Sequence, residues 1–399
     1  MERLSYDILV AGGGVAGLSC AAAFATAGFS VLCVDPAPPV TSAGQEGADL
    51  RTTAFFQGSR RFLDEAGIWS RLAPHAAPLQ IMRIVDAGGE TPTPRVTRDF
   101  DAADISDEPF GWNLPNWLLR REMVARLAEL PTVDFRPGTG FKSMITRQSE
   151  ALVALTDGTQ VRCRLVIGAD GRNSAVRQAV QIGAKTIRYG QKAVVFAVTH
   201  DLPHNNISTE VHRSGGPFTL VPLPDHDGRP CSSVVWMEHG PEVLRLATLP
   251  TADFNAAATE RSAGIYGPLT LVGQRQAWPI ISQIADRMTA ERTALVAEAA
   301  HVVPPIGAQG LNMSLGDMIC LLDLAKAQPD QLGSARMLAQ YERRRHPEVA
   351  LRVRGVDALN RASIAGTPIL RDLRARGLEA LYALSPLRKG VMELGLGAR

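Results

Sequence analysis

Hydrophobic and polar positions along the chain form short patterns, and each pattern predicts an element. Short apolar runs bounded by Gly, Pro or Asp are typical of buried strands, whereas a longer Ala-rich periodic stretch is typical of a helix. The first apolar run starts at Tyr6, a helical stretch follows and ends near Gly28, and a second apolar run closes on Asp35. This strand–helix–strand order predicts an α/β fold of the Rossmann type.

The turn between the first strand and the helix reads Gly12-x-Gly14-x-x-Gly17. Gly12 permits the tight turn, Gly14 lets backbone approach a pyrophosphate, and Gly17 lets the helix pack on the strand. The helix N-terminus offers free N–H groups and a partial positive charge to phosphates, with Val15 and Ala16 in its first turn. These five residues are therefore expected to bind a nucleotide.

Asp35 completes this half-site at the end of the second strand. An acid at this point can accept hydrogen bonds from both ribose hydroxyls of an adenosine. The pattern therefore predicts an ADP moiety, carried by either NAD or FAD.

A second patterned stretch follows about a hundred residues later. Two alternating strands flank Asp157-Gly158, which predicts a hairpin, and a third strand ends at Asp170-Gly171 before a helix near Asn173. By itself, Asp170 is equally well explained as a helix N-cap.

Taken with the residues around Asp170, this stretch resembles the flavoprotein aromatic hydroxylases. In that family a strand–GADG–helix element lies between the pyrophosphate site and the route by which the nicotinamide reaches the flavin. The matching residues are Gly168, Asp170, Gly171, Ser174 and Arg177. Because simple NAD dehydrogenases lack this element, the resemblance implies FAD, with Asp170 and Gly171 among the residues that bind it.

A third stretch, "LVAEAAHVVPPIGAQGLN" at 295–312, passes from a strand through a side-chain-poor loop into a helix that begins near Leu311. In the hydroxylases, a Gly-Asp pair and an Ala-Ala-His run precede a loop that cradles the ribityl chain and the isoalloxazine. Here Ala297-Glu298 replaces Gly-Asp. The resemblance implies that Glu298 accepts a ribityl hydroxyl. His301 has two interpretations, a structural residue or a general base.

The loop itself suits a flat ring. Its two prolines fix an extended path, its small residues admit backbone approach, and the dipole of the following helix stabilises an anionic reduced flavin. The residues expected at the ring are Pro305, Gly307, Gln309, Gly310, Leu311 and Asn312. No side chain is expected to act as a catalytic acid or base, because the flavin itself performs the chemistry.

Two further segments match the family. Arg51 stands where the hydroxylases have an arginine near the flavin, and Asn116 where they place a polar side chain beside the ring. Arg120 is counted with them as cofactor-binding. For Arg120 and Arg121 alike, a solvent-facing position is the alternative.

Residues 184–280 are rich in alternating apolar runs and turns, which predicts an antiparallel sheet over the flavin. The expected fold is thus a Rossmann-like FAD-binding domain of the glutathione-reductase type, with an inserted antiparallel substrate domain and a helical C-terminus. The FAD-binding domain is expected at 1–72, 113–182 and 284–340, the substrate domain at 73–112 and 183–283, and the helical region at 341–399.

Composition limits the alternatives. A formal net charge of +2 argues against nucleic acid as a partner, and five cysteines without a cluster argue against a metal site. The chain has neither a basic leader nor a run of ~18 apolar residues, which predicts a cytoplasmic protein, at most peripheral on the inner membrane face.

The C-terminal region is basic, with 13 Lys or Arg against 6 Asp or Glu from Arg336 to Arg399. It also carries leucines near helical spacing: Leu370, Leu373, Leu378, Leu381 and Leu384. Arg371, Arg374 and Arg376 lie among them. This tail could dock on a membrane, and a core-packing helix explains the leucines equally well.

The order of segments across nearly the whole chain resembles the hydroxylases of ubiquinone biosynthesis. That resemblance implies a monooxygenase that uses O₂ and NAD(P)H to hydroxylate a polyprenyl phenol through a flavin C4a-hydroperoxide. It also implies a ubiquinone-biosynthesis complex as a partner. The alternatives are a hydroxylase of a small soluble aromatic and a flavin-bearing scaffold without turnover. A halogenase fits less well, because its Trp-x-Trp-x-Ile-Pro signature is absent.

Overall fold

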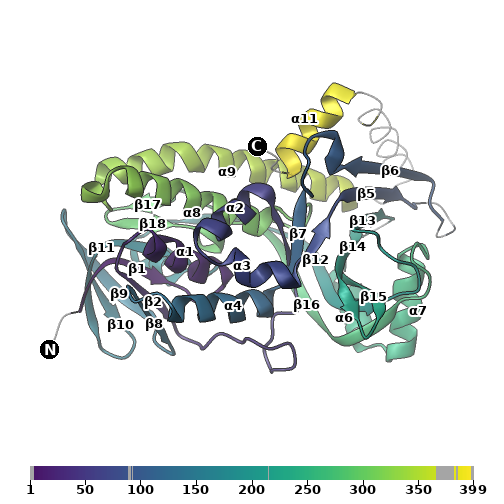
Figure 1. Ribbon diagram of the computed structural model, residues 1–399, viewed down its shortest axis with the longest axis horizontal. Coiled ribbons are helices and arrows are strands. Elements are labelled where there is room, and N and C mark those ends of the chain that lie inside the picture. Colours follow the sequence, from purple (N-terminus) through teal and green to yellow (C-terminus); the bar gives the residue numbers. More distant parts are fainter. Residues whose placement is uncertain are drawn as a thin grey trace.

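Two large β-sheets with helices packed on them make up the fold (Figure 1). The computed structural model describes residues 4–88, 91, 93–213, 215–364, 382 and 385–396. The first sheet lies at the left of Figure 1 beside α1 and α4, and the second lies at the right with α6 and α7. The predicted α/β architecture, with a parallel core and a separate antiparallel sheet, is confirmed.

The first sheet is parallel at its centre. Its strands run in the order β17-β18-β11-β1-β2-β8, and β10 and β9 continue from β11 as an antiparallel branch. Strands β1 and β2 are apolar throughout their central residues because helices or further strands cover both faces. The strand bounds are β1 Leu4–Ala11, β2 Val31–Asp35, β8 Val133–Pro137, β9 Phe141–Thr146, β10 Ala151–Leu155, β11 Gln160–Gly168, β17 Thr289–Ala290 and β18 Thr293–Leu295.

The predicted hairpin at Asp157-Gly158 joins β10 to β11. The two strands pair antiparallel, with Ala154 opposite Gln160, and Gly158 adopts a φ of +88°. A Cβ would be strained at that φ, which accounts for the glycine.

Helices α1 and α4 pack on each other and against the first sheet, while α8 packs between α1 and α9. The Ala-rich sequence of α1 suits this position because it is buried on nearly every side. The helices of this half are α1 Val15–Thr26, α2 Gln57–Glu65, α3 Trp69–Leu72, α4 Asn116–Ala128, α5 Ala175–Ala179, α8 Gln309–Ala327 and α9 Ala335–Ile364.

The second sheet has the order β19-β16-β12-β15-β14-β13-β5-β6, and only the β13–β5 pair within it is parallel. The antiparallel sheet predicted for 184–280 is thus confirmed, and it is extended by strands from 81–101. Its strands are β5 Ile81–Asp86, β6 Val96–Asp101, β12 Ala184–Thr199, β13 Ile207–His212, β14 Pro217–His226, β15 Arg229–His239, β16 Thr270–Ala285 and β19 His301–Val302.

The two faces of this second sheet have different neighbours. One face, with Phe196, Phe218 and Trp236, forms a core with α6 (Gly240–Thr248) and α7 (Thr251–Arg261). The opposite face turns toward the first half of the molecule, where Met237 packs with Ile306. The sheet therefore forms a wall over the loop that leads into α8.

A small third sheet links the two halves. Strand β7 (Gly111–Pro115) pairs with β3 (Thr52–Phe56) and β4 (Ala77–Leu79). The domain boundaries predicted from the sequence stay predictions, although each large sheet does draw its strands from separate parts of the chain.

Along the top of the molecule, α9 extends for 30 residues toward α11 (Ser385–Leu396) (Figure 1). Among the described residues, none of the helices has both the length and the apolarity to cross a membrane. The leucines and arginines predicted for tail docking, from Leu370 to Leu384, lie outside the described residues.

Candidate functional site

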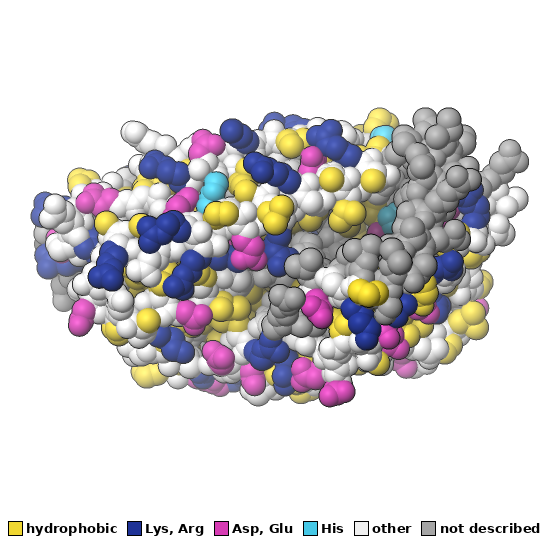
Figure 2. Space-filling model, turned by 90° about the horizontal axis from the view of Figure 1, so that it is seen from above, with side chains coloured by type: hydrophobic (Ala, Val, Ile, Leu, Met, Phe, Trp, Pro, Cys, Tyr) yellow, Lys and Arg dark blue, Asp and Glu magenta, His cyan; other side chains and the backbone are white. Residues whose placement is uncertain are grey.

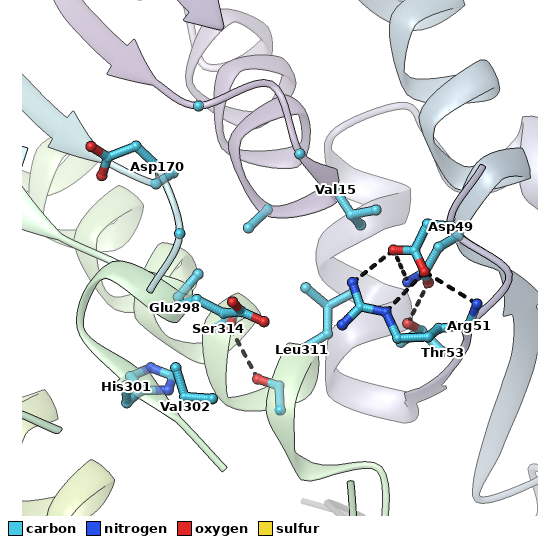
Figure 3. A pocket seen from close by; sticks show the side chains of 18 of the residues that line it. Val15, Asp49, Arg51, Thr53, Asp170, Glu298, His301, Val302, Leu311 and Ser314 are labelled. Atoms are coloured by element: carbon cyan, nitrogen blue, oxygen red, sulfur yellow. Dashed lines mark hydrogen bonds and ion pairs between the residues drawn. The ribbon is translucent and has the colours of Figure 1, made fainter. Parts of the chain in front are cut away.

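A cavity of about 650 Å³ lies where the first sheet, the start of α8 and the third sheet meet (Figure 3). Its volume is in the range of small-molecule and cofactor sites. In Figure 3, Asp170 and Glu298 lie on one side and Asp49, Arg51 and Thr53 on the other, with Val15 and Leu311 between them.

Most residues predicted at the site line this cavity. They are Gly12, Gly14, Val15, Ala16, Asp35, Arg51, Asn116, Arg120, Asp170, Gly171, Glu298, Pro305, Gln309, Gly310 and Leu311. Gly17, Gly307 and Asn312 are not in its lining.

The glycine-rich turn has the geometry of a phosphate cradle. A Cβ on Gly14 would meet nothing within 4 Å, so its backbone is open to the cavity. The α1 N-terminus has no side-chain cap and no acidic residue in its first turn. Its N–H groups are therefore available to an anion. Gly17 instead serves packing, because a Cβ there would lie 1.9 Å from the carbonyl oxygen of Gly12.

Asp35 is held in place at the end of β2. Its Oδ2 accepts from the backbone N–H of Gly13 at 2.5 Å, and its Oδ1 accepts from Ala37 at 2.9 Å. A carboxylate has about four acceptor positions, so both oxygens keep capacity for ribose hydroxyls.

The carboxylate of Asp170 is held by hydrogen bonds from the protein itself. It accepts from the Ser174 hydroxyl at 2.5 Å and from the N–H of Val176 at 3.0 Å, at the start of α5. The N-cap itself is Ser174, which accepts from Arg177. Arg177 in turn donates to the carbonyl oxygen of Ala299 at 2.7 Å. The GADG element and the segment that carries Glu298 are thus tied together.

Glu298 lies in a 3₁₀ turn, Ala297–Ala299, at the rim of the cavity. Its side chain is 42% exposed and pairs with Arg172 at 3.4 Å. The preceding Ala297 has a φ of +56°, in the left-handed region that favours glycine. This explains physically why glycine is the residue expected there and why alanine is a departure.

His301 is a buried structural residue in this geometry, although its ring also lines the cavity. Its Nε2 lies 2.7 Å from Oδ2 of Asp317. Arg345 donates to the other oxygen of Asp317, and the N–H of Ala297 donates to Oδ2. Burial raises the pKa of Asp317, but His301 and Arg345 outweigh it, so the pKa lies below its usual value.

The sequence patterns did not identify Asp49, which is 4% exposed and lines the cavity. Arg51 binds it through two hydrogen bonds of 2.8 and 2.7 Å, and Asn116 donates to it at 3.0 Å. Burial raises the pKa of the Asp49 carboxyl, yet Arg51, Asn116 and Arg120 together hold it below its ordinary range.

The two arginines predicted on α4 have different surroundings. Arg120 turns to the cavity and lies 3.6 Å from Asp49, whereas Arg121 is 44% exposed and pairs with Glu122. The solvent-facing alternative thus describes Arg121. The Nε of Arg120 is buried and has no hydrogen-bond partner in the described part of the chain.

The loop before α8 bends through two positive-φ residues, Gly307 (+61°) and Ala308 (+53°), and α8 then begins at Gln309 without a side-chain cap. The side chain of Asn312 is used by the protein, since it bonds Ala54, Phe56, Ser59 and Ala308. The first backbone N–H groups of α8 have no side-chain cap, and Gln309, Gly310 and Leu311, which carry them, line the cavity.

These features fit a flavin adenine dinucleotide. The uncapped start of α1 offers amides for the pyrophosphate, Asp35 offers acceptors for the ribose, and the uncapped start of α8 faces the part of the cavity lined by Pro305 and Leu311. The unpartnered Nε of Arg120 adds a buried donor that an acceptor group of the cofactor would satisfy.

Known proteins of similar sequence include hydroxylases and monooxygenases of ubiquinone biosynthesis. Ubiquinone hydroxylase UbiL of Rhodospirillum rubrum is 34% identical, and the match covers 98% of this chain and 89% of that protein. The 3-demethoxyubiquinol 3-hydroxylase of Escherichia coli is 26% identical, with both chains fully covered. Ubiquinone biosynthesis monooxygenase COQ6 of Homo sapiens is 28% identical over 97% of this chain and 92% of that protein.

A solved structure of similar fold is p-nitrophenol 4-monooxygenase PnpA from Pseudomonas putida. It superposes with a TM-score of 0.80 at 18% identity and covers 100% of this chain and 98% of that one. The FAD binding domain family matches residues 5–355. The predicted cofactor and the predicted superfamily are confirmed, and the chain belongs to the FAD binding domain family.

Proposed function

We propose that this chain is a monooxygenase that adds a hydroxyl group to the aromatic ring of a polyprenyl phenol in ubiquinone biosynthesis. The names of its relatives support the reaction and the pathway. The observation that carries the substrate class is the similarity to ubiquinone hydroxylases over nearly the whole chain. The apolar part of the sheet wall over the loop before α8 agrees with it.

That wall is formed by the face of the second sheet turned away from α6 and α7. Ala193, Met237 and Ile280 cluster there with Ile306 of the loop and Val356 of α9. Partly buried neighbours of this cluster are Tyr189, Val235 and Val303. Apart from Val303, these residues lie outside the cavity lining, so their role in this proposal is to keep water from the loop. The positive charge at the cavity comes from Arg51 and Arg120.

In this proposal FAD, when bound, supplies the electron transfer and oxygen activation that the side chains cannot. The chain's residues would bind and orient it: the α1 amides would hold the pyrophosphate, Asp35 and Glu298 would accept hydroxyls, and the α8 amides would stabilise negative charge on the ring. The buried wall excludes water from the reacting ring. His301 keeps its bond to Asp317 and moves no proton. NAD(P)H is the proposed electron donor.

Peripheral membrane contact is a second part of the proposal, because a polyprenylated substrate resides in a bilayer. The outer face of α9 exposes Leu351 by 70% and Leu359 by 60%. Arg343, Arg344 and Arg354 are exposed on the same helix and form no ion pair among the described residues. Figure 2 looks onto this side, where basic and hydrophobic side chains lie intermixed. Such a face suits an anionic lipid surface.

The test of the proposed function is oxygen incorporation followed by mass spectrometry. The FAD-loaded enzyme receives NAD(P)H, O₂ and either a polyprenyl phenol in detergent or a panel of short soluble phenols. We expect one added oxygen on the prenylated compound. Oxygen added only to a soluble phenol would assign the alternative hydroxylase activity. NAD(P)H oxidation that no phenol stimulates, with no product, would favour the flavin-bearing scaffold.

A further inference from the structure

Asp49 is the one carboxylate shared by the polar side chains on its side of the cavity. It bonds Arg51 through both oxygens, accepts from Asn116, and lies 3.6 Å from Arg120. Asn116 is fixed in turn, because Thr53 donates to its Oδ1 at 2.8 Å. The four residues that contact Asp49 or Asn116 all line the cavity. They are Arg51, Thr53, Asn116 and Arg120.

The segment that carries Asp49 is also fastened to the second sheet. Gln276 of β16 donates to the carbonyl oxygen of Ala48 at 2.7 Å and accepts from the N–H of Leu50 at 3.3 Å. Two residues further along β16, Trp278 stacks under the guanidinium of Arg51 at 4.2 Å from its ring centre. Arg51 therefore has two anchors, a carboxylate and an aromatic face.

The charges of this cluster do not cancel. Arg51 and Arg120 each carry one positive charge and Asp49 carries one negative charge, so one positive charge remains at the cavity wall. The carboxylate of Glu298, across the cavity, pairs with Arg172 and also acts electrostatically on Arg51, and it is the same in all the variants below. Charges in a partly buried site are weakly screened, so this excess acts on a ligand in the cavity.

We infer that Asp49 is a positioning residue that fixes Arg51 and Arg120 beside the bound FAD as a cluster with a single net positive charge, and that this net charge sets the reduction potential of the flavin. Positive charge favours the reduced flavin, which carries more negative charge than the oxidised form. With Asp49 present, the reduction potential of the flavin is therefore lower than it would be with the two arginines alone. Arg51 and Arg120 each raise that potential. This inference requires FAD and is independent of the hydroxylation substrate.

The test is a spectroelectrochemical titration of FAD-loaded variants without any phenol, so that it is unaffected if the proposed substrate is wrong. In Asp49→Asn the net charge becomes +2, and we expect a more positive potential than in the wild type. In the double variant Asp49→Asn/Arg51→Gln the net charge returns to +1, and we expect the potential to return toward the wild-type value. A purely structural role for Asp49 would not produce that reversal.

A matched control is available in the second sheet. Arg83 binds Asp99 through two hydrogen bonds of 2.7 Å, the same geometry as Arg51 with Asp49, and neither residue lines the cavity. Asp99→Asn should leave the potential unchanged. An unchanged potential in Asp49→Asn, or a shift that Arg51→Gln does not reverse, would overturn the inference.

If Asp49→Asn does not fold, the single variants Arg51→Gln and Arg120→Gln decide the question. Each removes one positive charge, and each should make the potential more negative than in the wild type. Potentials in both variants equal to that of the wild type would also overturn the inference.

Discussion

Nε2 of His301 lies 2.7 Å from Oδ2 of Asp317, and neither side chain reaches solvent. Asp317 belongs to α8, while His301 follows directly from the turn that carries Glu298. The other oxygen of Asp317 accepts from Arg345 of α9. One buried carboxylate therefore fixes a wall of the cavity to the two helices behind it.

We expect Asp317→Ala to destabilise the protein strongly, because the buried guanidinium of Arg345 loses its buried carboxylate and keeps only Glu348 and the carbonyl oxygen of Met313. Loss of one partner from a buried pair costs about 3–5 kcal/mol. Chemical denaturation of the apoprotein at neutral pH measures the effect. The control is Arg245→Gln, which breaks the exposed Arg245–Glu242 pair of α6 and should leave the stability nearly unchanged. Equal losses in the two variants would contradict this role.

The same residue predicts a pH dependence. The pKa of Asp317 is lowered in the folded protein from its ordinary 3.8, despite burial, by His301 and Arg345. Because the pKa is lower in the folded state, the Asp317 carboxylate contributes its full stabilisation at pH values above the pKa of the unfolded state. That stabilisation is lost as the pH falls through the pKa of the folded state. The stability difference between wild type and Asp317→Asn should therefore stay constant from neutral pH down to about pH 5 and shrink only below about pH 4.

Ala297→Gly should stabilise the segment before His301. Ala297 has a φ of +56°, where a Cβ costs about 1 kcal/mol or more, and glycine removes that cost. The greater freedom of glycine in the unfolded chain offsets part of the gain. We expect a small rise in the melting temperature of the apoprotein. Ala299→Gly, in the same turn but without positive φ, is the control and should lower it.

Gly14 and Gly17 should separate cofactor binding from folding. A Cβ at Gly14 meets open space and φ there is −74°, so Gly14→Ala should fold normally. Its methyl group would occupy the approach to the α1 amides and weaken FAD binding, by about tenfold or more. In Gly17→Ala the Cβ would clash with the backbone of Gly12, so the apoprotein itself should be destabilised. Flavin fluorescence quenching and thermal melting measure the two effects.

Glu298→Ala tests the predicted acceptor for the ribityl chain. Loss of one charged acceptor should weaken FAD binding by roughly tenfold. Because Glu298 is 42% exposed, its pair with Arg172 adds little stability, and the melting temperature of the apoprotein should hardly change. Arg172→Gln breaks the same ion pair and should leave FAD affinity within about twofold. An unchanged FAD affinity in Glu298→Ala would refute the assignment.

The sequence predicted those parts of the site that depend on backbone near a short motif. The Gly12–Gly17 turn, the Asp157-Gly158 hairpin and the loop before α8 each carry glycines or prolines at fixed spacing. Asp49 and Asp317 carry no such signal, because their partners are distant along the chain. Asn116 follows Asp49 by 67 residues, and Arg345 follows Asp317 by 28. Only the packing of α4 on the first sheet and of α9 on α8 brings these charges together.

The outer face of α9 should bind anionic lipid. Leu351 and Leu359 can enter the interface while Arg343, Arg344 and Arg354 meet the head groups, so binding should fall with added salt. We expect the full-length protein to sediment with vesicles that contain an anionic lipid and not with neutral ones. The double variant Leu351→Ser/Leu359→Ser should lose most of this binding.

Leu202 and Leu244 provide the matched control for that variant, since they are 54% and 55% exposed but lie in the second half of the molecule, away from α9. Leu202→Ser/Leu244→Ser should bind vesicles as the wild type does. Deletion of residues 366–399 separates α9 from the predicted basic tail. If the deletion abolishes binding while Leu351→Ser/Leu359→Ser retains it, the lipid contact belongs to the tail, and the role assigned to α9 is wrong.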